Sequence, residues 1–316
     1  MEYKKGYSFS TSWNTKRHTN GREMINEIKE LGFGQVELNY NVPEEMLKSI
    51  TPMIDKGEIK VSSVHNVFPF YEDKDYGTDT PMLGFDDVEK RKKAVDLLIN
   101  SIEYADRLGA KGVVVHPGEV PFSYNIDTEL KNIWREKGKD SKEYQSLWNE
   151  MLHRRNELAP IYTKRIQDSL EEAADFIVKK NINVKIGIET RARCYQIPTL
   201  KEADQIIDNL KGSPVYLWYD VGHGMIMESM GLYDNVNEVQ QMKDKILGVH
   251  IHETIDLVDH YCPYIHSGDN VTFDSFLEVI DAVPLKVYEL KGNCSEQQIE
   301  DSYQLMTKKI QALKIN

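Results

Sequence analysis

Six side chains of the types that bind metal ions follow six successive apolar segments of the chain, one to each segment. They are His65, His116, Glu189, Asp220, His250 and Glu289. Each segment is short and rich in β-branched or aromatic residues, which predicts a strand that ends near the polar residue. An isolated histidine at a strand end is more often a hydrogen-bonded structural residue than a ligand. Six such residues in succession indicate one shared site.

Binding of a divalent metal ion is the chemistry that these residue types favour. Three carboxylates and three imidazoles in one place would cost several kcal/mol for each unpaired buried charge, and a cation removes that cost. A set rich in oxygen suits Mn²⁺, Mg²⁺ or Co²⁺; here it consists of Glu189, Asp220, Glu289 and one imidazole, that of His250. Further histidines would favour Zn²⁺ and more than one ion; these are His65, His116 and His223.

Eight alternations of strand and helix are expected to position these residues. The strands are predicted at residues 7–13, 33–40, 61–67, 111–117, 185–191, 215–221, 246–252 and 285–291. Helical spacing of apolar residues fills the intervals, with stop signals at Leu31-Gly32 and Leu108-Gly109. Eight units favour a single α/β domain over residues 1–316, a (β/α)₈ TIM barrel, because closure leaves no exposed sheet edge. In such a barrel the carboxyl ends of the strands meet at one pocket.

An open doubly wound sheet is the alternative fold. The phosphate-binding patterns typical of such sheets, GxGxxG after the first strand and GxxxxGK[ST], are missing from the sequence. Two connections are longer than usual, at residues 68–85 and 118–160. Long loops after barrel strands lie on the catalytic face. We therefore expect both to act as lids or substrate walls, and the insertion at 118–160 to be partly helical.

The composition narrows the possible partners. The 316 residues carry 39 Lys and Arg against 51 Asp and Glu, a net charge of −12, which disfavours nucleic acid as a partner. No apolar run approaches the roughly 20 residues of a membrane span, and the first ten residues lack the apolar stretch of a secretory signal. A cytoplasmic protein with three reduced cysteines and no membrane partner is expected. The sequence does not specify an oligomeric state.

The segments around the strand ends resemble those of the xylose isomerase-like TIM barrels. This superfamily includes ketose epimerases, inosose-processing enzymes and the endonuclease IV family of abasic-site nucleases. The resemblance covers nearly the whole chain and rests on SVHNVFPF, VVVHPGE, GIET, YDVGHG, GVHIHET and YELKG, in this order. It implies a divalent metal cofactor bound by Glu189, Asp220, His250 and Glu289. It also implies that Glu189 and Glu289 are the catalytic acid and base.

Other positions resemble functional residues of both the epimerase branch and the nuclease branch of the superfamily. His223 resembles a histidine that touches substrate in the epimerases and binds metal in the nucleases. His65 and His116 resemble histidines that bind additional zinc in endonuclease IV. Two departures stand out: Asp259-His260 are adjacent where the nucleases have Asp-x-His, and IHETIDLVD lacks an arginine that the epimerases place there.

The preferred hypothesis is a metal-dependent isomerase or epimerase that transfers a proton through an enediolate. The substrate would be a ketose, a cyclic polyol ketone or a sugar phosphate, bound by His65, His116, His223 and Arg191. Arg191 follows Glu189 closely and could face a phosphate or carboxylate group of the substrate. One alternative is a zinc phosphodiesterase of the endonuclease IV type acting on abasic DNA. Another is a barrel that binds sugars without catalysis.

Overall fold

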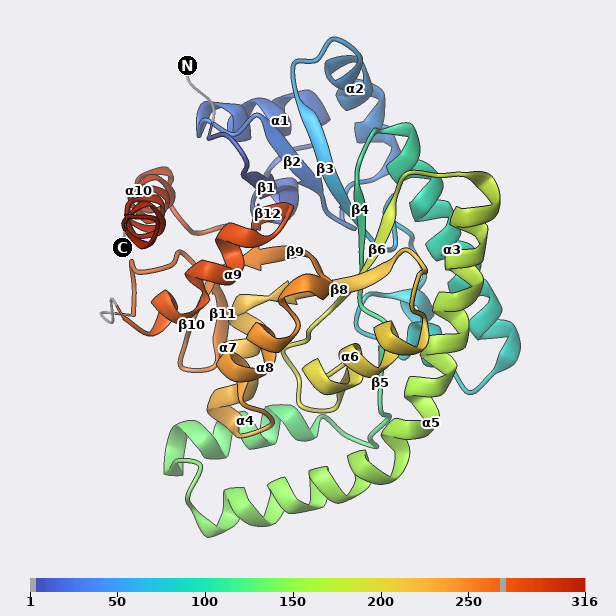
Figure 1. Cartoon of the computed structure of the whole chain (residues 1–316), viewed down its shortest axis with the longest axis vertical. Coiled ribbons are helices and arrows are strands. Elements are labelled where there is room, and N and C mark those ends of the chain that lie inside the picture. The colour runs from blue at the N-terminus through green and yellow to red at the C-terminus, as the bar shows by residue number, and fades with distance from the viewer. Residues whose placement is uncertain (1–3, 268–270, 316) are drawn as a thin grey trace.

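The computed structural model describes residues 4–267 and 271–315. Within these residues eight parallel strands close into a barrel that helices surround (Figure 1). In barrel order the strands are β1 (Ser8–Ser10), β12 (Leu285–Tyr288), β9 (Ile246–Ile251), β8 (Val215–Asp220), β6 (Lys185–Glu189), β4 (Gly112–Val115), β3 (Lys60–His65) and β2 (Gln35–Leu38). Strand β1 pairs with both β2 and β12, which closes the ring. The predicted TIM barrel is confirmed, and the open sheet is excluded.

Each barrel strand overlaps a predicted strand but is shorter than the prediction. The strands end early at the mouth, where polar residues such as His116 and Thr190 leave the ladder. Two short antiparallel pairs lie outside the barrel. They are β5 (Gly118–Glu119) with β7 (Gln196–Ile197), and β10 (Glu253–Ile255) with β11 (Val258–Tyr261).

Most of the helices begin at a residue whose side chain caps the first turn. The helices are α1 (Gly21–Glu30), α2 (Glu44–Asp55), α3 (Val88–Arg107), α4 (Ile126–Lys137), α5 (Lys142–Lys180), α6 (Leu200–Asn209), α7 (Val221–Met230), α8 (Asn235–Gln241), α9 (Leu277–Ala282) and α10 (Glu296–Leu313). The predicted stops follow α1 and α3, where Gly32 and Gly109 have φ of +87° and +73°. Among the described residues, no helix is both long enough and apolar enough to span a bilayer.

A tryptophan fills the barrel interior below the strand ends. Trp218 is fully buried with Val114, Leu247 and Val287 around it. Glycines on the neighbouring strands leave room for its indole, because a Cβ on Gly248 would lie 2.6 Å from the ring. The barrel is therefore a packed core rather than a channel, and the space for a ligand lies above this layer.

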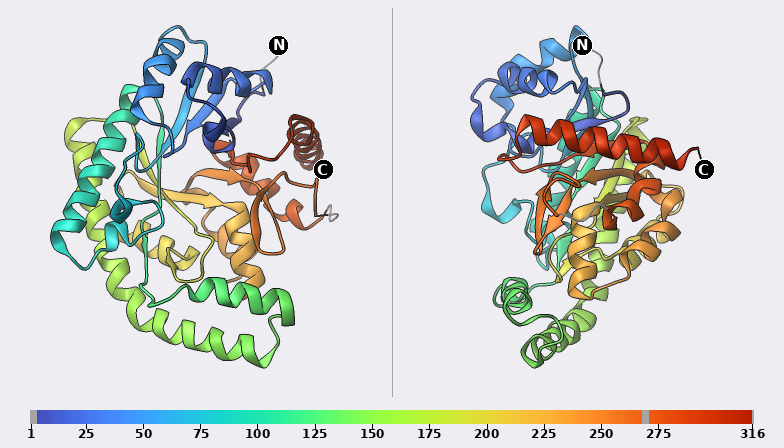
Figure 2. Two further views of the ribbon diagram at one scale, coloured as in Figure 1. Left: turned by 180° about the vertical axis from the view of Figure 1, so that it is seen from behind. Right: turned by 90° about the vertical axis from the view of Figure 1, so that its left-hand side faces the viewer.

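The insertion at residues 118–160 is mainly helical and forms an arm beside the barrel. It contains β5, α4 and the first half of α5, and α4 with that half of α5 extends from the barrel (green in Figures 1 and 2). Helix α5 continues through Pro160 to Lys180, so the arm and the outer helix of the barrel are one continuous helix. A second apolar cluster fixes the arm to α7 and to the segment after β6; it includes Leu130, Trp148, Tyr195, Met227 and Leu257.

Candidate active site

Four side chains from the carboxyl ends of four barrel strands meet at the mouth. They are Glu189 of β6, Asp220 of β8, His250 of β9 and Glu289, which directly follows β12. Each offers one ligand atom, and these atoms all lie within 4.8 Å of one another. We call these residues the metal-ligand group. His250 Nδ1 lies 3.2 Å from Glu189 Oε1, 3.5 Å from Asp220 Oδ2 and 3.1 Å from Glu289 Oε2.

The metal-ligand group is buried and strongly acidic. Burial alone would raise the pKa of Glu189, but His116 and Arg191 outweigh it and hold that pKa well below the ordinary value. Burial would also raise the pKa of Asp220, but the charges of the neighbouring imidazoles, His223 first, outweigh this effect. The pKa of Asp220 therefore lies below its ordinary value as well. For His250, burial alone would lower the pKa. The surrounding carboxylates, Glu289 first, outweigh burial and hold the pKa of His250 well above its usual range. The group therefore gathers negative charge around a single imidazole.

This donor set fits a divalent cation. Among the described residues, the ion-pair partners of Asp220 and Glu289 are histidines, with no lysine or arginine. Of the three carboxylates only Glu189 has a permanent cation beside it, Arg191 at 3.2 Å. Three buried carboxylates around one imidazole are costly in a protein interior unless an ion compensates them. Three oxygen donors and one nitrogen donor suit Mn²⁺, Mg²⁺ or Co²⁺, and Zn²⁺ also accepts such ligands.

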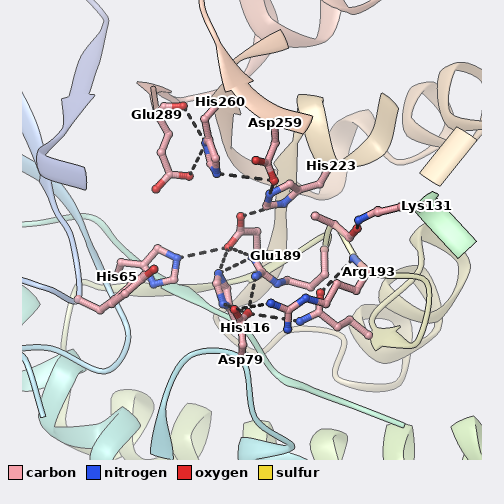
Figure 3. Close-up of a pocket in the computed structure, with 14 residues that line it drawn as sticks. His65, Asp79, His116, Lys131, Glu189, Arg193, His223, Asp259, His260 and Glu289 are labelled. Carbon is pink, nitrogen blue, oxygen red and sulfur yellow. Dashed lines mark hydrogen bonds and ion pairs between the residues drawn. The ribbon is translucent and has the colours of Figure 1, made fainter. Parts of the chain in front are cut away.

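His65 and His116 lie on the other side of Glu189 (Figure 3), where Arg191 contacts both His116 and Glu189. Glu189 Oε2 is 2.6 Å from His116 Nε2 and 3.4 Å from His65 Nε2. Arg191 Nη1 lies 2.5 Å from His116 Nε2 and 3.2 Å from Glu189 Oε2. Burial and then the charge of Arg191 lower the pKa of His116 to about 3, so its ring is neutral at pH 7. The guanidinium thus supplies positive charge where these two histidines and Glu189 meet.

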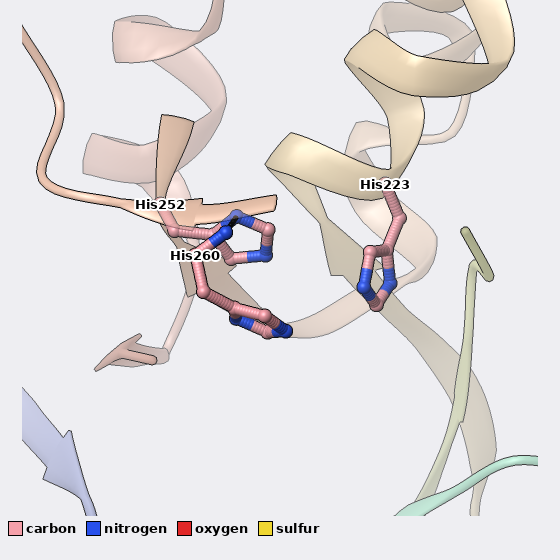
Figure 4. Close-up of side chains that lie close together, drawn as sticks. All are labelled: His223, His252 and His260. Carbon is pink, nitrogen blue, oxygen red and sulfur yellow. Dashed lines mark hydrogen bonds between the residues drawn. The ribbon is translucent and has the colours of Figure 1, made fainter. Parts of the chain in front are cut away.

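Three further histidines lie close together (Figure 4), and two of them, His223 and His260, line the pocket. His223, His252 and His260 could each offer one ligand atom. Both nitrogens of His252 are engaged, since Nδ1 accepts from the His260 N–H at 2.9 Å and Nε2 donates to Asp220 Oδ1 at 2.8 Å. Asp259 Oδ2 lies 3.6 Å from His223 Nε2 and 4.0 Å from His260 Nε2. Burial alone would lower the pKa of His223, but the charge of Asp220 and the hydrogen bond to Asp259 outweigh burial and raise that pKa to about 9.

Four imidazoles of the pocket share one orientation. Each donates its Nδ1 proton to a backbone carbonyl at 3.0 Å and turns Nε2 towards a carboxylate of the pocket. They are His65, His116, His223 and His260. A carbonyl only accepts, so Nδ1 of each ring carries a proton. Rings held in this way are suited to bind an ion or to contact a substrate oxygen.

The opposite wall of the pocket carries a second set of charges, the arginine side: Asp79, Lys131, Arg191 and Arg193. Asp79 accepts from Arg191 Nη2 at 2.9 Å and from Arg193 Nη2 at 3.3 Å. Lys131 of α4 pairs with Asp127 at 2.8 Å and donates to the Ala192 carbonyl at 2.7 Å. Between the two sides lies a cavity of about 230 Å³, lined almost entirely by polar side chains.

The structure brings together all the site residues named from the sequence. His65, His116, His223 and Arg191 line the cavity with Glu189 and Glu289, while Asp220 and His250 lie immediately behind them. Sequence reasoning did not assign Asp79 and Lys131 to the pocket. They come from the two long connections, whose length was the signal that they reach this face.

Comparisons with known proteins place this geometry in a family. Residues 25–307 match the family described as xylose isomerase-like TIM barrel, so the chain belongs to that family. Among curated protein sequences, none matches the chain significantly.

Several solved structures share the fold over nearly the full length of both chains. A 3-keto-D-glucoside 4-epimerase from E. coli superposes with a TM-score of 0.65 at 18% identity, covering 96% of this chain and 99% of its own. A D-tagatose 3-epimerase-like protein gives 0.65 at 17% identity, with 98% of each chain covered. A D-psicose 3-epimerase from Clostridium cellulolyticum H10, determined with D-tagatose, gives 0.63 at 12% identity, with 97% and 98% covered. At these identities the likeness shows a common fold.

Proposed function

We propose that this protein is a metal-dependent isomerase or epimerase that moves a proton next to the carbonyl group of a sugar, through an enediolate. The substrate class is a ketose, a cyclic polyol ketone or a sugar phosphate. The observation that carries the proposal is the metal-ligand group, in which two glutamates face one cavity at the mouth of the barrel. The sugar epimerases among the structural neighbours support it as proteins of the same fold.

The metal-ligand group would hold the ion, and Glu189 and Glu289 would transfer the proton. A bound divalent ion supplies Lewis-acid polarisation of the substrate carbonyl and of the neighbouring hydroxyl oxygen. Strands β8 and β9 separate β6 from β12 in the barrel, so Glu189 and Glu289 approach the cavity from different directions. One carboxylate removes the proton from carbon, and the other returns it on the opposite face.

The rest of the pocket would bind the substrate. A cavity of about 230 Å³ falls below the roughly 300–1,000 Å³ typical of drug-sized ligands, which suits a monosaccharide. His65, His116 and His223 can bind hydroxyl oxygens, because each ring is held by a carbonyl behind it. Arg191, beside Glu189, contributes a positive charge to the lining of the cavity. We propose that the arm formed by α4 and α5 is a substrate wall, because Lys131 of α4 lines the cavity.

Solvent hydrogen exchange tests the proposal without knowledge of the product. The protein is stripped of metal, reloaded separately with Mn²⁺, Co²⁺, Mg²⁺ or Zn²⁺, and incubated in D₂O with ketoses, inososes and ketose phosphates. Deuterium should enter at the carbon next to the carbonyl of at least one substrate, as NMR would show. Glu289→Gln should lose this exchange and keep its fold. A Glu289→Gln enzyme that still exchanges would exclude Glu289 as the base, and binding of a sugar without exchange would favour the non-catalytic barrel.

The second candidate function is a zinc phosphodiesterase of the endonuclease IV type. The fixed orientation of four imidazoles, with Nε2 turned into the pocket, favours it, because ligands for additional ions would be held in the same way. Arg191 counts against it, since the guanidinium lies where His116 and Glu189 would share an ion. This function requires about three bound zinc ions and nicking of abasic duplex DNA; one ion and no nicking would exclude it.

A further inference from the structure

Two side chains contact the metal-ligand group from behind, away from the cavity. Glu37 belongs to β2, and His252 directly follows β9. Both are completely buried, with 0% exposure, and neither lines the pocket. A buried carboxylate and a buried imidazole are costly to keep in a protein interior, so a specific contact is expected for each.

Glu37 fixes the orientation of His250. Its two oxygens lie 3.1 and 3.2 Å from His250 Nε2, and Ser63 Oγ donates to Oε2 at 2.8 Å. A carboxylate only accepts, so Nε2 of the imidazole carries a proton. Nδ1 faces the oxygens of Glu189, Asp220 and Glu289 and is therefore the nitrogen that an ion would share with them. Negative charge behind the ring also increases the basicity of Nδ1.

His252 fixes the orientation of Asp220 in a corresponding way. Its Nδ1 accepts from the His260 backbone N–H, so Nε2 carries the proton that Asp220 accepts. The ring therefore has no lone pair left for an ion. A Cβ on Gly222 would lie 2.1 Å from the His252 ring, so only glycine fits at this position of α7. Gly222, the first glycine of the motif DVGHG, thus gives His252 the space to reach Asp220.

We infer that Glu37 and His252 are positioning residues that set the geometry and basicity of two metal ligands, His250 and Asp220. The inference rests on the proposed metal-dependent function. It extends that function to a second layer of residues, which determines how tightly the ion is bound. Outer partners of metal ligands typically change the metal affinity 10- to 100-fold when they are removed.

Calorimetric titration of the metal-free full chain with Mn²⁺ tests the inference. Glu37→Gln and His252→Asn should each weaken Mn²⁺ binding about 10- to 100-fold. Ser169→Ala is the matched control: Ser169 is a buried serine of α5 that donates to the Leu83 carbonyl at 2.9 Å, and its variant should bind as the wild type does. The visible absorption of the Co²⁺-loaded protein should shift in Glu37→Gln and stay unchanged in Ser169→Ala.

The outcomes separate this inference from the proposed function. Folded Glu37→Gln and His252→Asn proteins that bind Mn²⁺ within twofold of the wild type would overturn the inference alone. A wild type that binds no Mn²⁺, Co²⁺ or Zn²⁺ would overturn the proposed function and the inference with it. If Glu37→Gln does not fold, Ser63→Ala replaces it, since it keeps the carboxylate but removes the hydroxyl that holds it. Unchanged affinity in Ser63→Ala would then contradict the role of Glu37.

Discussion

The two sides of the pocket handle charge in opposite ways. On the arginine side each charged side chain pairs with a side chain of opposite charge: Asp79 pairs with Arg191 and Arg193, and Lys131 pairs with Asp127. In the metal-ligand group, the described partners of Asp220 and Glu289 are imidazoles. The charged side chains of the arginine side are thus paired with other side chains of the protein, whereas the metal-ligand group offers a donor set that could hold an added cation.

This difference predicts that changes on the arginine side affect mainly the folding free energy, whereas changes in the metal-ligand group affect mainly metal binding. Breaking a contact on the arginine side should cost folding free energy and leave the ion in place. Removing a carboxylate from the metal-ligand group should remove the ion and cost little stability, because it lowers the repulsion between buried negative charges. Each prediction below tests that contrast.

The largest effect is expected for Asp220→Asn. The amide keeps the size of the side chain but removes one of the three negative charges that hold the ion. Metal binding should fall below detection, and turnover should fall at least about 10⁴-fold, since Lewis-acid stabilisation contributes several kcal/mol. Metal analysis and the deuterium exchange assay measure both losses. Asp127→Asn, a carboxylate change on the opposite wall, should keep its ion; a metal-loaded Asp220→Asn would break the contrast.

A large loss of stability is expected for Arg155→Leu. Arg155 is buried behind the arginine side, pairs with both oxygens of Glu202 at 2.7 Å, and donates to the carbonyls of Cys194 and Gln196. Its removal leaves the largely buried Glu202 carboxylate without its partner and two backbone carbonyls without a donor, and should lower the free energy of unfolding by about 3 kcal/mol in urea titrations. Arg154→Leu changes an exposed neighbour and should cost less than about 1 kcal/mol. Equal costs for the two would contradict the assigned role of Arg155.

A pH-dependent effect is expected at Glu119, near the arginine side. Burial, aided by Asp79, raises its pKa to about 7 against the opposing charges of Arg193 and Arg191. The unfolded chain releases this proton near pH 4.5 and the folded chain only near pH 7, so the group destabilises the fold progressively over that interval. Glu119→Gln should therefore be more stable than the wild type at pH 8 by up to about 2 kcal/mol, and no more stable at pH 4. Unfolding curves at both pH values test the sign, and an equal difference at both would contradict it.

The smallest effect is expected for Asp79→Asn. Asp79 is partly exposed, so loss of its pairs with Arg191 and Arg193 should cost about 1 kcal/mol of stability. Mn²⁺ affinity should stay within about threefold of the wild type, since its partners on this wall already neutralise Asp79. Glu143→Gln removes a fully exposed pair with Lys137 and should have less effect on stability. A large loss of metal affinity in Asp79→Asn would show that the two sides are not independent.

The barrel and the strand-end residues could be predicted from sequence because both follow short-range patterns. Short segments rich in β-branched or aromatic residues, each ending in a polar residue, predict the strands, and barrel closure brings the ends of distant strands together. Glu189 and Glu289 are 100 positions apart in the sequence, yet both reach His250 Nδ1. The predicted strands were too long at their mouth ends, where the ladder stops before polar residues such as His116 and Thr190.

The remaining contacts depend on long-range geometry that no local pattern encodes. Asp79 and Lys131 reach the pocket along connections whose path depends on packing against α5 and α7. His252 lies two residues after His250, which predicts the same face of a strand, but β9 ends at Ile251. The ring instead turns towards α7, where Gly222 leaves room for it. The contact of Glu37 with His250 requires the alignment of β2 and β9 across the barrel, which only the closed fold determines.

Anomalous diffraction from crystals of the Mn²⁺-loaded protein tests the central claim most directly. We predict one strong peak per chain within about 2.0–2.6 Å of Glu189, Asp220, His250 and Glu289. Three peaks in zinc-loaded crystals would instead support the phosphodiesterase. An ion bound elsewhere, or no ion in contact with these four side chains, would contradict the account.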